Sequence, residues 1–192
     1  MDNPEQEIIE RILAGNPQEF SLLVERFKSR VFNYIYRMIN NYDSALELSQ
    51  DVFLKSYASL DKYDPAYRFS TWIFRISANT AIDFLRKKKG MYTSIDQPIH
   101  YNGEDNLYLQ IKDSGESPLE SLQQKEISSK IEEAIRLLPE KYQELIILRH
   151  INDCSYQEIS DITRLPLGTV KNRIFRAREA LKQLLEEKGE LT

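Results

Sequence analysis

The sequence predicts an all-α protein of two small helical domains joined by a flexible linker. Apolar side chains recur with helical spacing in both halves of the chain, and no segment shows the alternation of a β-strand. Three of the six glycines and two of the seven prolines lie between Gly90 and Pro118, where this periodicity fails. We therefore assign a first domain to residues 1–92, an acidic linker to 93–122 and a second domain to 123–192. A stretched linker of this length spans about 100 Å, so the two domains need not touch.

Start and stop signals bound the long helices of the first domain. One helix opens at the Asn16-Pro17 pair, with the asparagine as cap and the proline at the first helical position. The Ser70-Thr71 pair caps the last helix, which ends near Gly90. The expected helices cover residues 17–39, 44–59 and 69–88.

The second domain is expected to hold four shorter helices, over about 119–137, 139–151, 155–164 and 168–187. Ser155, followed three residues later by Glu158, forms a capping box that opens the third of these helices. Residues 165–168 make a tight connector, and Thr169 caps the helix that follows. Two short helices joined in this way form a helix-turn-helix, whose second helix lies in the major groove of DNA.

Charge is distributed unevenly along the chain. The 192 residues carry 26 Lys and Arg against 30 Asp and Glu, a net charge of −4. Residues 68–89 nevertheless hold six basic side chains against Asp83 alone, and residues 164–182 hold six against Glu179 alone. The linker holds one lysine against six acids. Two basic stripes on an acidic chain suit a DNA contact whose non-specific affinity stays low.

Composition excludes several classes of protein. The longest aliphatic run covers only residues 145–148, so we expect no membrane insertion, and the acidic N-terminus is unlike a secretory signal. Cys154 is the only cysteine, which excludes an intramolecular disulfide and a multi-cysteine metal site. We expect a soluble, cytoplasmic protein without a metal or cofactor.

Catalysis finds little support in the sequence. His150 and Cys154 lie four residues apart and suggest a dyad or a metal site. The Asn152-Asp153 pair between them is typical of an interhelical turn, which spoils that geometry, and a buried small thiol is the commoner case. The chain contains no glycine-rich phosphate loop and no nucleophile elbow. We therefore expect no catalytic residue.

The helix expected over residues 168–187 separates apolar from polar side chains. Its inner stripe consists of Val170, Ile174, Ala177, Leu181 and Leu184. Its outer side carries Lys171, Asn172, Phe175, Arg176 and Glu179, flanked by Arg173 and Arg178 near the stripe. Asn172 can bond adenine, Arg176 can bond guanine and Phe175 can touch thymine methyl groups. The alternative is an ordinary solvated helix with a surplus of arginine, although an exposed aromatic side chain argues against it.

A second candidate surface lies on the helix over residues 69–88. Its buried face is expected to hold Ile73, Phe74, Ala81, Phe84 and Leu85. Its solvent face is expected to hold Trp72, Arg75, Asn79, Asp83 and Arg86, followed by Lys87, Lys88 and Lys89. An aromatic ring for stacking and an amide for base edges suit unstacked bases. The alternative, with Trp72 in the core and Asn79 as a plain surface residue, stays open.

A weaker candidate is a protein-docking surface on the helix over residues 44–59. Ala45, Leu48 and Val52 are expected to face inward, whereas Glu47, Gln50, Asp51 and Leu54 face outward beside Phe53 and Tyr57. Acids and an exposed leucine beside aromatic rings suit a partner helix. A helix with two buried sides produces the same pattern.

These segments together resemble a known family. The motifs SQDVFLKSYASLDKYD, FSTWIFRISANTAIDFLRKKK and LPEKYQELIILRHINDCSYQEISDITRLPLGTVKNRIFRARE are similar to those of bacterial RNA polymerase sigma factors of the extracytoplasmic-function (ECF) class. The resemblance covers nearly the whole chain, with sigma domain two before sigma domain four. One departure is that Ser44-Ala45-Leu46-Glu47 replaces the common Asp-Ala-Glu-Asp, which loses two acids at the polymerase-binding helix.

The resemblance implies a role for each surface. The chain would bind core RNA polymerase through Gln50, Asp51 and Leu54, which would contact the clamp helices of the largest subunit. Single-stranded −10 DNA would meet Trp72, Arg75, Asn79, Asp83, Arg86 and Lys87, with a flipped base at Asn79. Duplex −35 DNA would meet Arg149, Thr169, Lys171, Asn172, Arg173, Phe175 and Arg176.

The resemblance also implies partners and a class of activity. The linker would thread toward the active centre of the polymerase, and an anti-sigma factor would occlude the polymerase-binding surfaces. We therefore expect a non-enzymatic subunit that directs promoter-specific initiation. The alternative from a different class is a stand-alone helix-turn-helix regulator, which is usually a dimer on a palindromic site.

Overall fold

The computed structural model of the chain describes residues 4–92 and 118–187, which form helices and no strand. The long helices are α1 (Pro4–Leu13), α2 (Phe20–Ile39), α3 (Tyr42–Ala58), α4 (Phe69–Tyr92), α5 (Pro118–Leu137), α6 (Glu140–Ile146), α7 (Tyr156–Thr163) and α8 (Leu167–Glu187). Shorter turns are η1 (Pro17–Glu19), η2 (Leu60–Lys62) and the π-helical η3 (Ile147–Ile151). The all-α prediction is confirmed for the described residues. Most of the predicted linker, residues 93–117, lies outside them, and its last five residues belong to α5.

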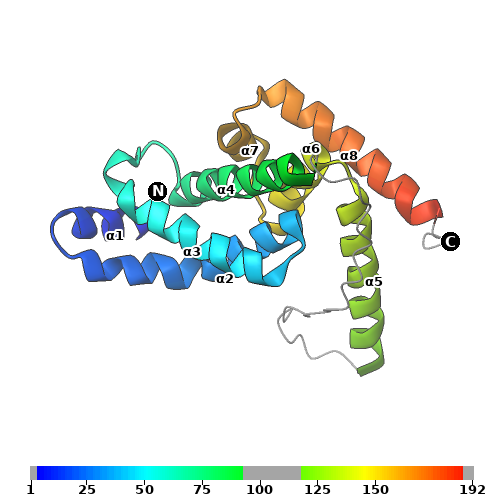
Figure 1. The fold of residues 1–192 in the computed structure, drawn as a ribbon, viewed down its shortest axis with the longest axis horizontal. Helices are drawn as coiled ribbons and strands as arrows, with labels where there is room; N and C mark the ends of the chain where they lie inside the picture. Colours follow the sequence, from blue (N-terminus) through cyan, green and yellow to red (C-terminus); the bar gives the residue numbers. More distant parts are fainter. Residues whose placement is uncertain (1–3, 93–117, 188–192) are drawn as a thin grey trace.

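Helices α2, α3 and α4 pack against one another and form the first domain, with α1 against α2 (Figure 1). Asn40 ends α2 in the left-handed conformation with φ 50°, which asparagine tolerates better than most residues. Asn41 then caps α3, because its side-chain oxygen accepts the backbone N–H of Ser44 at 2.8 Å. The interhelical break predicted at residues 40–43 therefore contains two different capping devices.

The second domain contains the predicted helix-turn-helix, formed by α7 and α8. The capping box at the start of α7 is complete: the Ser155 N–H donates to the Glu158 carboxylate at 2.8 Å, and the Glu158 N–H donates to the Ser155 hydroxyl at 3.2 Å. Arg164 closes α7 in the left-handed conformation with φ 57°. Only residues 164–166 separate the two helices, so the turn is short.

The predicted starts of α4 and α8 match the structure within one residue, but the residues assigned as their caps are wrong. The Trp72 N–H already bonds the Arg68 carbonyl, and the Val170 N–H already bonds the Pro166 carbonyl. The Ser70-Thr71 pair and Thr169 therefore lie inside the first turns of α4 and α8 rather than at their caps. Helix α4 continues to Tyr92, two residues beyond Gly90, near which it was predicted to end.

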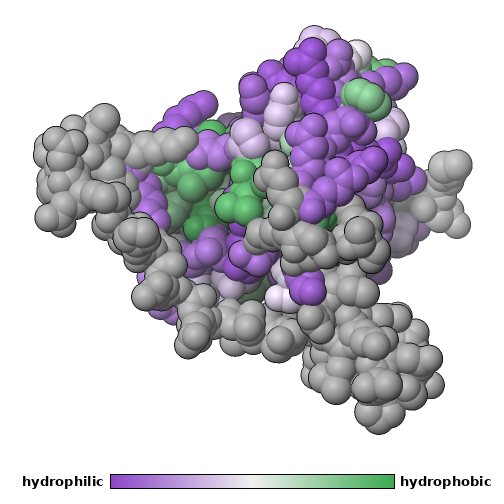
Figure 2. Space-filling model, turned by 90° about the vertical axis from the view of Figure 1, so that its right-hand side faces the viewer, coloured by the Kyte–Doolittle hydropathy of each residue, from purple (hydrophilic) through white to green (hydrophobic). Residues whose placement is uncertain are grey.

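The two domains are in contact and share one hydrophobic core. Helix α7 packs along α4, while α6 and η3 pack against α2. A cleft between the domains is lined by apolar side chains of both, among them Met38, Leu85 and Leu138. The face toward the right of Figure 1, seen directly in Figure 2, gathers hydrophobic residues near its middle between hydrophilic areas. The linker length predicted that the two domains need not touch, whereas in the structure they are in contact.

Candidate nucleic-acid interface

The outer side of α8 is a solvent-facing row of polar and aromatic side chains. Val170, Ile174 and Ala177 are buried on the inner stripe, as the helical wheel predicts. On the other side, Phe175 leaves 65% of its surface exposed. The remaining exposed members of this row are Lys171, Asn172, Arg176 and Glu179. An exposed ring between an amide and a guanidinium can contact thymine methyl groups while these polar groups bond base edges, so the row is suited to contact bases.

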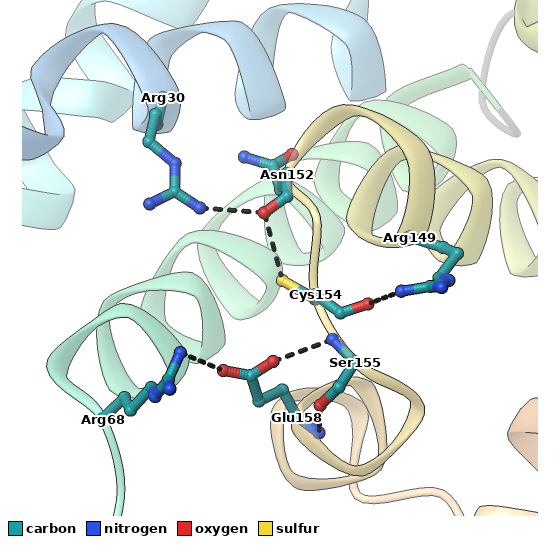
Figure 3. Close-up of polar contacts among 7 residues, drawn as sticks. All are labelled: Arg30, Arg68, Arg149, Asn152, Cys154, Ser155 and Glu158. Carbon is teal, nitrogen blue, oxygen red and sulfur yellow. Dashed lines mark hydrogen bonds and ion pairs between the residues drawn. The ribbon is translucent and has the colours of Figure 1, made fainter. Parts of the chain in front are cut away.

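Three other residues that were predicted to contact −35 DNA are less exposed or are held by other contacts. Thr169 and Arg173 are half-buried. The Arg149 guanidinium donates to the Cys154 carbonyl at 2.9 Å (Figure 3). It also lies 5.2 Å from the centre of the Tyr156 ring. Arg149 therefore holds the entrance to α7 in place, which leaves it less able to reach toward a duplex.

The exposed side of α4 is mainly polar. Asn79, Asp83, Arg86 and Lys87 are exposed, and the Arg86 guanidinium lies 3.5 Å from the Asp83 carboxylate one turn before it. Arg75 is half-buried because it lines a cleft against α7 and the helix-turn-helix turn. An amide flanked by basic side chains remains on this side of α4 and can take base edges and phosphates.

The prediction that Trp72 faces solvent is wrong. Its side chain is only 6% exposed and packs against the rings of Tyr63 and Phe69, at centroid distances of 5.6 and 5.5 Å. The helical wheel assigned α4 one buried face, but Tyr63 from the loop before α4 packs over the first turn of the helix, against Phe69 and Trp72. Trp72 therefore fixes that loop, and its ring face is not available to stack on a base.

Helix α3 presents an exposed surface at the predicted positions. Gln50 and Asp51 are exposed, and Leu54 leaves 67% of its surface in solvent. Ala45 and Val52 are fully buried, so the predicted inner side of the helix is confirmed. An exposed leucine of this kind is a typical contact for a partner protein.

The dyad that the spacing of His150 and Cys154 suggests, and that the sequence analysis argues against, finds no support in the pKa values of the two groups. Burial raises the pKa of the Cys154 thiol to about 12, so the thiol is protonated at neutral pH. Burial also lowers the pKa of His150, as do the charges of Arg178 and Arg149 beside it. The described residues contain no cluster of three or more His, Cys, Asp and Glu side chains placed to bind a metal ion.

Comparisons with known proteins match both domains. The family model of Sigma-70 region 2 covers residues 23–90, and that of Sigma-70 region 4 covers residues 128–181. The ECF RNA polymerase sigma factor SigW of Bacillus subtilis is 35% identical over 93% of this chain and 95% of its own length. The chain belongs to the ECF sigma factors.

Other sigma factors are similar over the same extent. The sigma-H factor of Pseudomonas aeruginosa is 31% identical over 95% of this chain and 94% of its own. Two solved structures share the fold, each at 22% sequence identity. The complex of CnrH with the cytosolic domain of CnrY has a TM-score of 0.66, and the match covers 94% of this chain and 96% of that chain. The complex of the sigma factor RpoE with the anti-sigma factor NepR from Bartonella quintana has a TM-score of 0.69, and the match covers 88% of this chain and 98% of that chain. Both sigma regions match in order, which favours a sigma factor over a stand-alone regulator.

The matched regions contain the surfaces described above. Region 2 covers α3 and the exposed side of α4 up to Gly90, and region 4 covers α7 and the part of α8 that carries Phe175. No helix among the described residues of this sigma factor is both long and apolar enough to cross a membrane.

Sequence reasoning missed one apolar member of the α3 surface, Leu46. Leu46 and the aromatic residue Tyr57, which was named from the sequence, are both exposed beside the predicted contacts. A signal for Leu46 was present, because Leu46, Gln50, Leu54 and Tyr57 recur at intervals of four, four and three residues on one side of a helix. Leu46, noted only as the loss of an acid from the family pattern, extends an apolar docking surface.

Proposed function

We propose that this sigma factor binds core RNA polymerase and directs it to promoters by recognising a −35 element as duplex and a −10 element as single strand. The observation that carries the proposal is the exposed Phe175 between Asn172 and Arg176 on the second helix of a helix-turn-helix. Asparagine and arginine have the donor and acceptor geometry to distinguish bases in the major groove, and the ring adds contact with thymine methyl groups.

In the proposed −35 contact, some side chains of α8 bond bases and others contact phosphates. The amide of Asn172 and the guanidinium of Arg176 lie one turn apart and can meet neighbouring base pairs. Lys171 and Arg178, both exposed, supply charge for phosphates. Because the whole stretch 164–182 carries six bases and one acid, its affinity falls steeply with salt.

The −10 contact uses α4. We propose that Asn79 accepts an extruded base, while Arg86 and Lys87 neutralise the strand beside it. Unstacking a base costs a few kcal/mol, and hydrogen bonds from a shaped protein surface offset that cost. Trp72 takes no part in stacking in this account, since it supports the loop that precedes α4.

Helix α3 provides the polymerase contact. Leu46, Leu54 and Tyr57 form an apolar row with Gln50 beside it, which suits an amphipathic helix such as a clamp helix of the largest subunit. The function is non-enzymatic, because the polymerase supplies the chemistry and this chain supplies position and strand capture.

An anti-sigma factor is a further proposed partner. One structural neighbour was solved with a protein named as an anti-sigma factor, and the α3 row offers apolar surface that such a protein can cover. Competition between the two partners for α3 would then control the sigma factor.

The proposal is tested most simply at Asn79. In a holoenzyme assembled with the Asn79→Ala variant, we expect the yield of open promoter complexes in a permanganate footprint to fall about 5-fold or more, for a loss of about 1–3 kcal/mol. Closed-complex formation, measured by binding at low temperature, is expected to change little, because α8 is untouched. Gln183→Ala, which removes an exposed amide from α8, is the matched control. Equal losses in both assays for Asn79→Ala would show that Asn79 does not capture the melted strand.

A further inference from the structure

His150 and Arg178 form a polar pair at one edge of the exposed row on α8. His150 lies in η3, and Arg178 lies on α8, 28 positions later in the sequence. The Nε and Nη2 atoms of the Arg178 guanidinium lie 3.3 and 3.2 Å from His150 Nε2. A guanidinium can only donate, so His150 Nε2 accepts both N–H groups and the neutral ring carries its proton on Nδ1. Both side chains are exposed to solvent.

The backbone on either side of His150 is fixed by hydrogen bonds and burial. The Asn152 N–H bonds the Ile147 carbonyl at 3.1 Å, and the Cys154 N–H bonds the Leu148 carbonyl at 3.0 Å. Ile147 and Leu148 are themselves fully buried. Short π-helical turns such as η3 are rare in proteins and are found frequently at functional sites. His150 is therefore an exposed side chain on a well-anchored turn, and it meets α8 through Arg178.

The cation of the His150–Arg178 pair lacks an anionic partner. Lys182, one turn further along α8, has Glu186 at 3.6 Å, whereas no carboxylate pairs with Arg178 in the described part of the chain. Two N–H groups of Arg178 share one neutral nitrogen, at distances longer than the usual hydrogen bond of about 2.9–3.0 Å. The same edge of a guanidinium binds phosphate oxygens through two parallel, charge-assisted bonds. A phosphate is therefore a stronger partner for this edge than the imidazole.

Arg178 also lies where a DNA backbone would run beside the base-reading residues. It follows Lys171 by seven residues, which is about two helical turns, so the two cations lie along one line of α8. Asn172 and Arg176 lie further round the helix, with Phe175 between them and this line. A helix in the major groove contacts base edges with some side chains and the flanking phosphates with others. The line through Lys171 and Arg178 is the flank suited to phosphates.

We propose that His150 and Arg178 form a phosphate site on α8, in which the imidazole nitrogen holds the place of a phosphate oxygen until DNA binds. A phosphate of the −35 duplex then replaces His150 Nε2 at the guanidinium edge. The imidazole takes up a proton from solvent and donates its Nε2–H to the same phosphate. The assignment of this phosphate to the −35 duplex rests on the proposed function, whereas the pair itself does not.

The charged groups around His150 set the direction of the pH dependence. Burial lowers the pKa of His150 from 6.5, as do the charges of Arg178 on α8 and Arg149 on η3, while Asp153 in the turn before α7 raises it. The ring is therefore mainly neutral at neutral pH in the free protein. A bound phosphate stabilises the imidazolium form and raises this pKa. The complex then holds more protons than its free components, so the affinity for duplex rises as pH falls.

The pair is tested first in the free, full-length protein, without polymerase or DNA. Nuclear magnetic resonance follows the imidazole signals during a pH titration, and the one other histidine, His100, is identified by the signal that His100→Gln removes. We expect Arg178→Ala to raise the pKa of His150, because it removes the charge and the hydrogen bonds that favour the neutral ring. Lys182→Ala, which removes a cation paired with Glu186, should leave that pKa unchanged. An equal pKa in the parent and Arg178→Ala proteins would overturn the proposal.

The phosphate site is tested in the holoenzyme on a promoter duplex at low temperature. Affinity is measured at about pH 6 and about pH 8 for the parent, His150→Gln and His150→Ala. Uptake of one proton raises affinity by at most about 10-fold per pH unit, and we expect the parent to gain about 3-fold or more over His150→Gln at the lower pH. Taking the difference between variants removes the contribution of other titrating groups, such as Glu144 near the Arg173 charge.

The two substitutions of His150 separate a role in DNA binding from a structural role. Glutamine keeps an acceptor for Arg178 and a donor for phosphate but takes up no proton. At the higher pH, His150→Gln should therefore bind like the parent, and His150→Ala should bind more weakly. A histidine that only stabilised the fold would give the same pH dependence in the parent and in His150→Gln, and that result would overturn the proton-linked phosphate site.

Failure of this site and failure of the proposed function give different results. Equal pH dependence in the parent and His150→Gln, with base preference at the −35 element intact, overturns the phosphate site alone. Promoter binding without any sequence preference in the parent would overturn the proposed function and, with it, the assignment of the phosphate to the −35 duplex. The titration of the free protein requires neither DNA nor polymerase, so it decides the His150–Arg178 pair in both cases.

Discussion

Arg176 lies on the exposed side of α8, one turn beyond Asn172 and next to Phe175. A guanidinium in this place can bond guanine through two parallel hydrogen bonds. We expect Arg176→Ala to cost about 1–3 kcal/mol at one base pair of the −35 element and to relax the preference there. Holoenzyme binding to a set of duplexes with each base pair varied measures this.

Lys182→Ala is the control for Arg176, because this exposed lysine of α8 lies beyond the proposed base contacts, beside Glu186 at 3.6 Å. It should weaken binding slightly and uniformly. A preference profile for Arg176→Ala that matches the parent at every position would remove Arg176 from the base-reading residues.

The carboxyl group of Glu144 on α6 has a pKa near neutrality. Burial raises its pKa from 4.5 to about 7, and the Arg173 charge opposes part of that rise. The folded protein therefore holds this proton more tightly than the unfolded chain, and stability falls as pH rises from about 4.5 to about 7. We expect Glu144→Gln to raise the free energy of unfolding at pH 8 by about 1–3 kcal/mol and to change it little at pH 4.5.

Urea denaturation at the two pH values measures the effect, with the exposed Glu179→Gln on α8 as control. The Glu144→Gln variant should lose the fall in stability that the parent and the control show over this pH range. Parallel curves for all three proteins would show that Glu144 titrates normally in the fold.

Single residues also mark where sequence reasoning stops. Phe175 and Arg176 could be placed on the solvent side of α8 because that helix packs through one stripe only. Trp72 could not be placed, because α4 is covered on several sides and the covering residues Tyr63 and Phe69 come from the loop before it and from its own first turn. A helical wheel assumes that a helix has one covered face, so it misplaces residues on a helix that is covered on several sides.

At the scale of elements, α3 carries the polymerase contact in this account. Leu54 is 67% exposed in the middle of its outer row, where a partner helix would bury it completely. We expect Leu54→Ala to weaken binding to core polymerase by about 1–2 kcal/mol, which is a factor of about 5–30. Fluorescence anisotropy of the labelled sigma factor titrated with core polymerase provides the measurement.

Leu137→Ala removes an equally large exposed leucine, which lies at the end of α5 in the other domain, and it should leave the affinity unchanged. Similar losses in both variants would indicate a general effect of exposed apolar surface rather than docking through α3.

The elements themselves were largely predictable. The capping box at Ser155 places the start of α7 correctly, because side-chain and backbone hydrogen bonds there are encoded within four residues. The starts of α4 and α8 were predicted within one residue, but their caps were misassigned, because the Arg68 and Pro166 carbonyls accept helical bonds ahead of the expected cap residues. The exposed side of α3 was predicted in part: Leu54 and Tyr57 were named from the sequence, and the contribution of Leu46 was missed.

At the scale of the whole molecule, two-domain organisation follows from the glycine and proline cluster, but domain contact does not. Arg30 and Arg37 have the appearance of ordinary surface arginines in sequence, and only the fold shows that they meet Asn152 and Glu132 more than 90 positions away. Such long-range pairs involve no local pattern, so sequence periodicity cannot reveal them. The contact between the two domains therefore depends on the folded chain and not on a local sequence pattern.

The central claim, that this chain selects promoters through α8 and α4, is tested most directly by transcription in vitro from a random promoter library with core polymerase and the purified sigma factor. We expect selected templates to share two elements separated by a fixed spacing. Arg176→Ala should alter the preference in the upstream element only, and Asn79→Ala should lower the yield from the downstream one. Selection that is absent, or that both variants leave unchanged, would contradict the account.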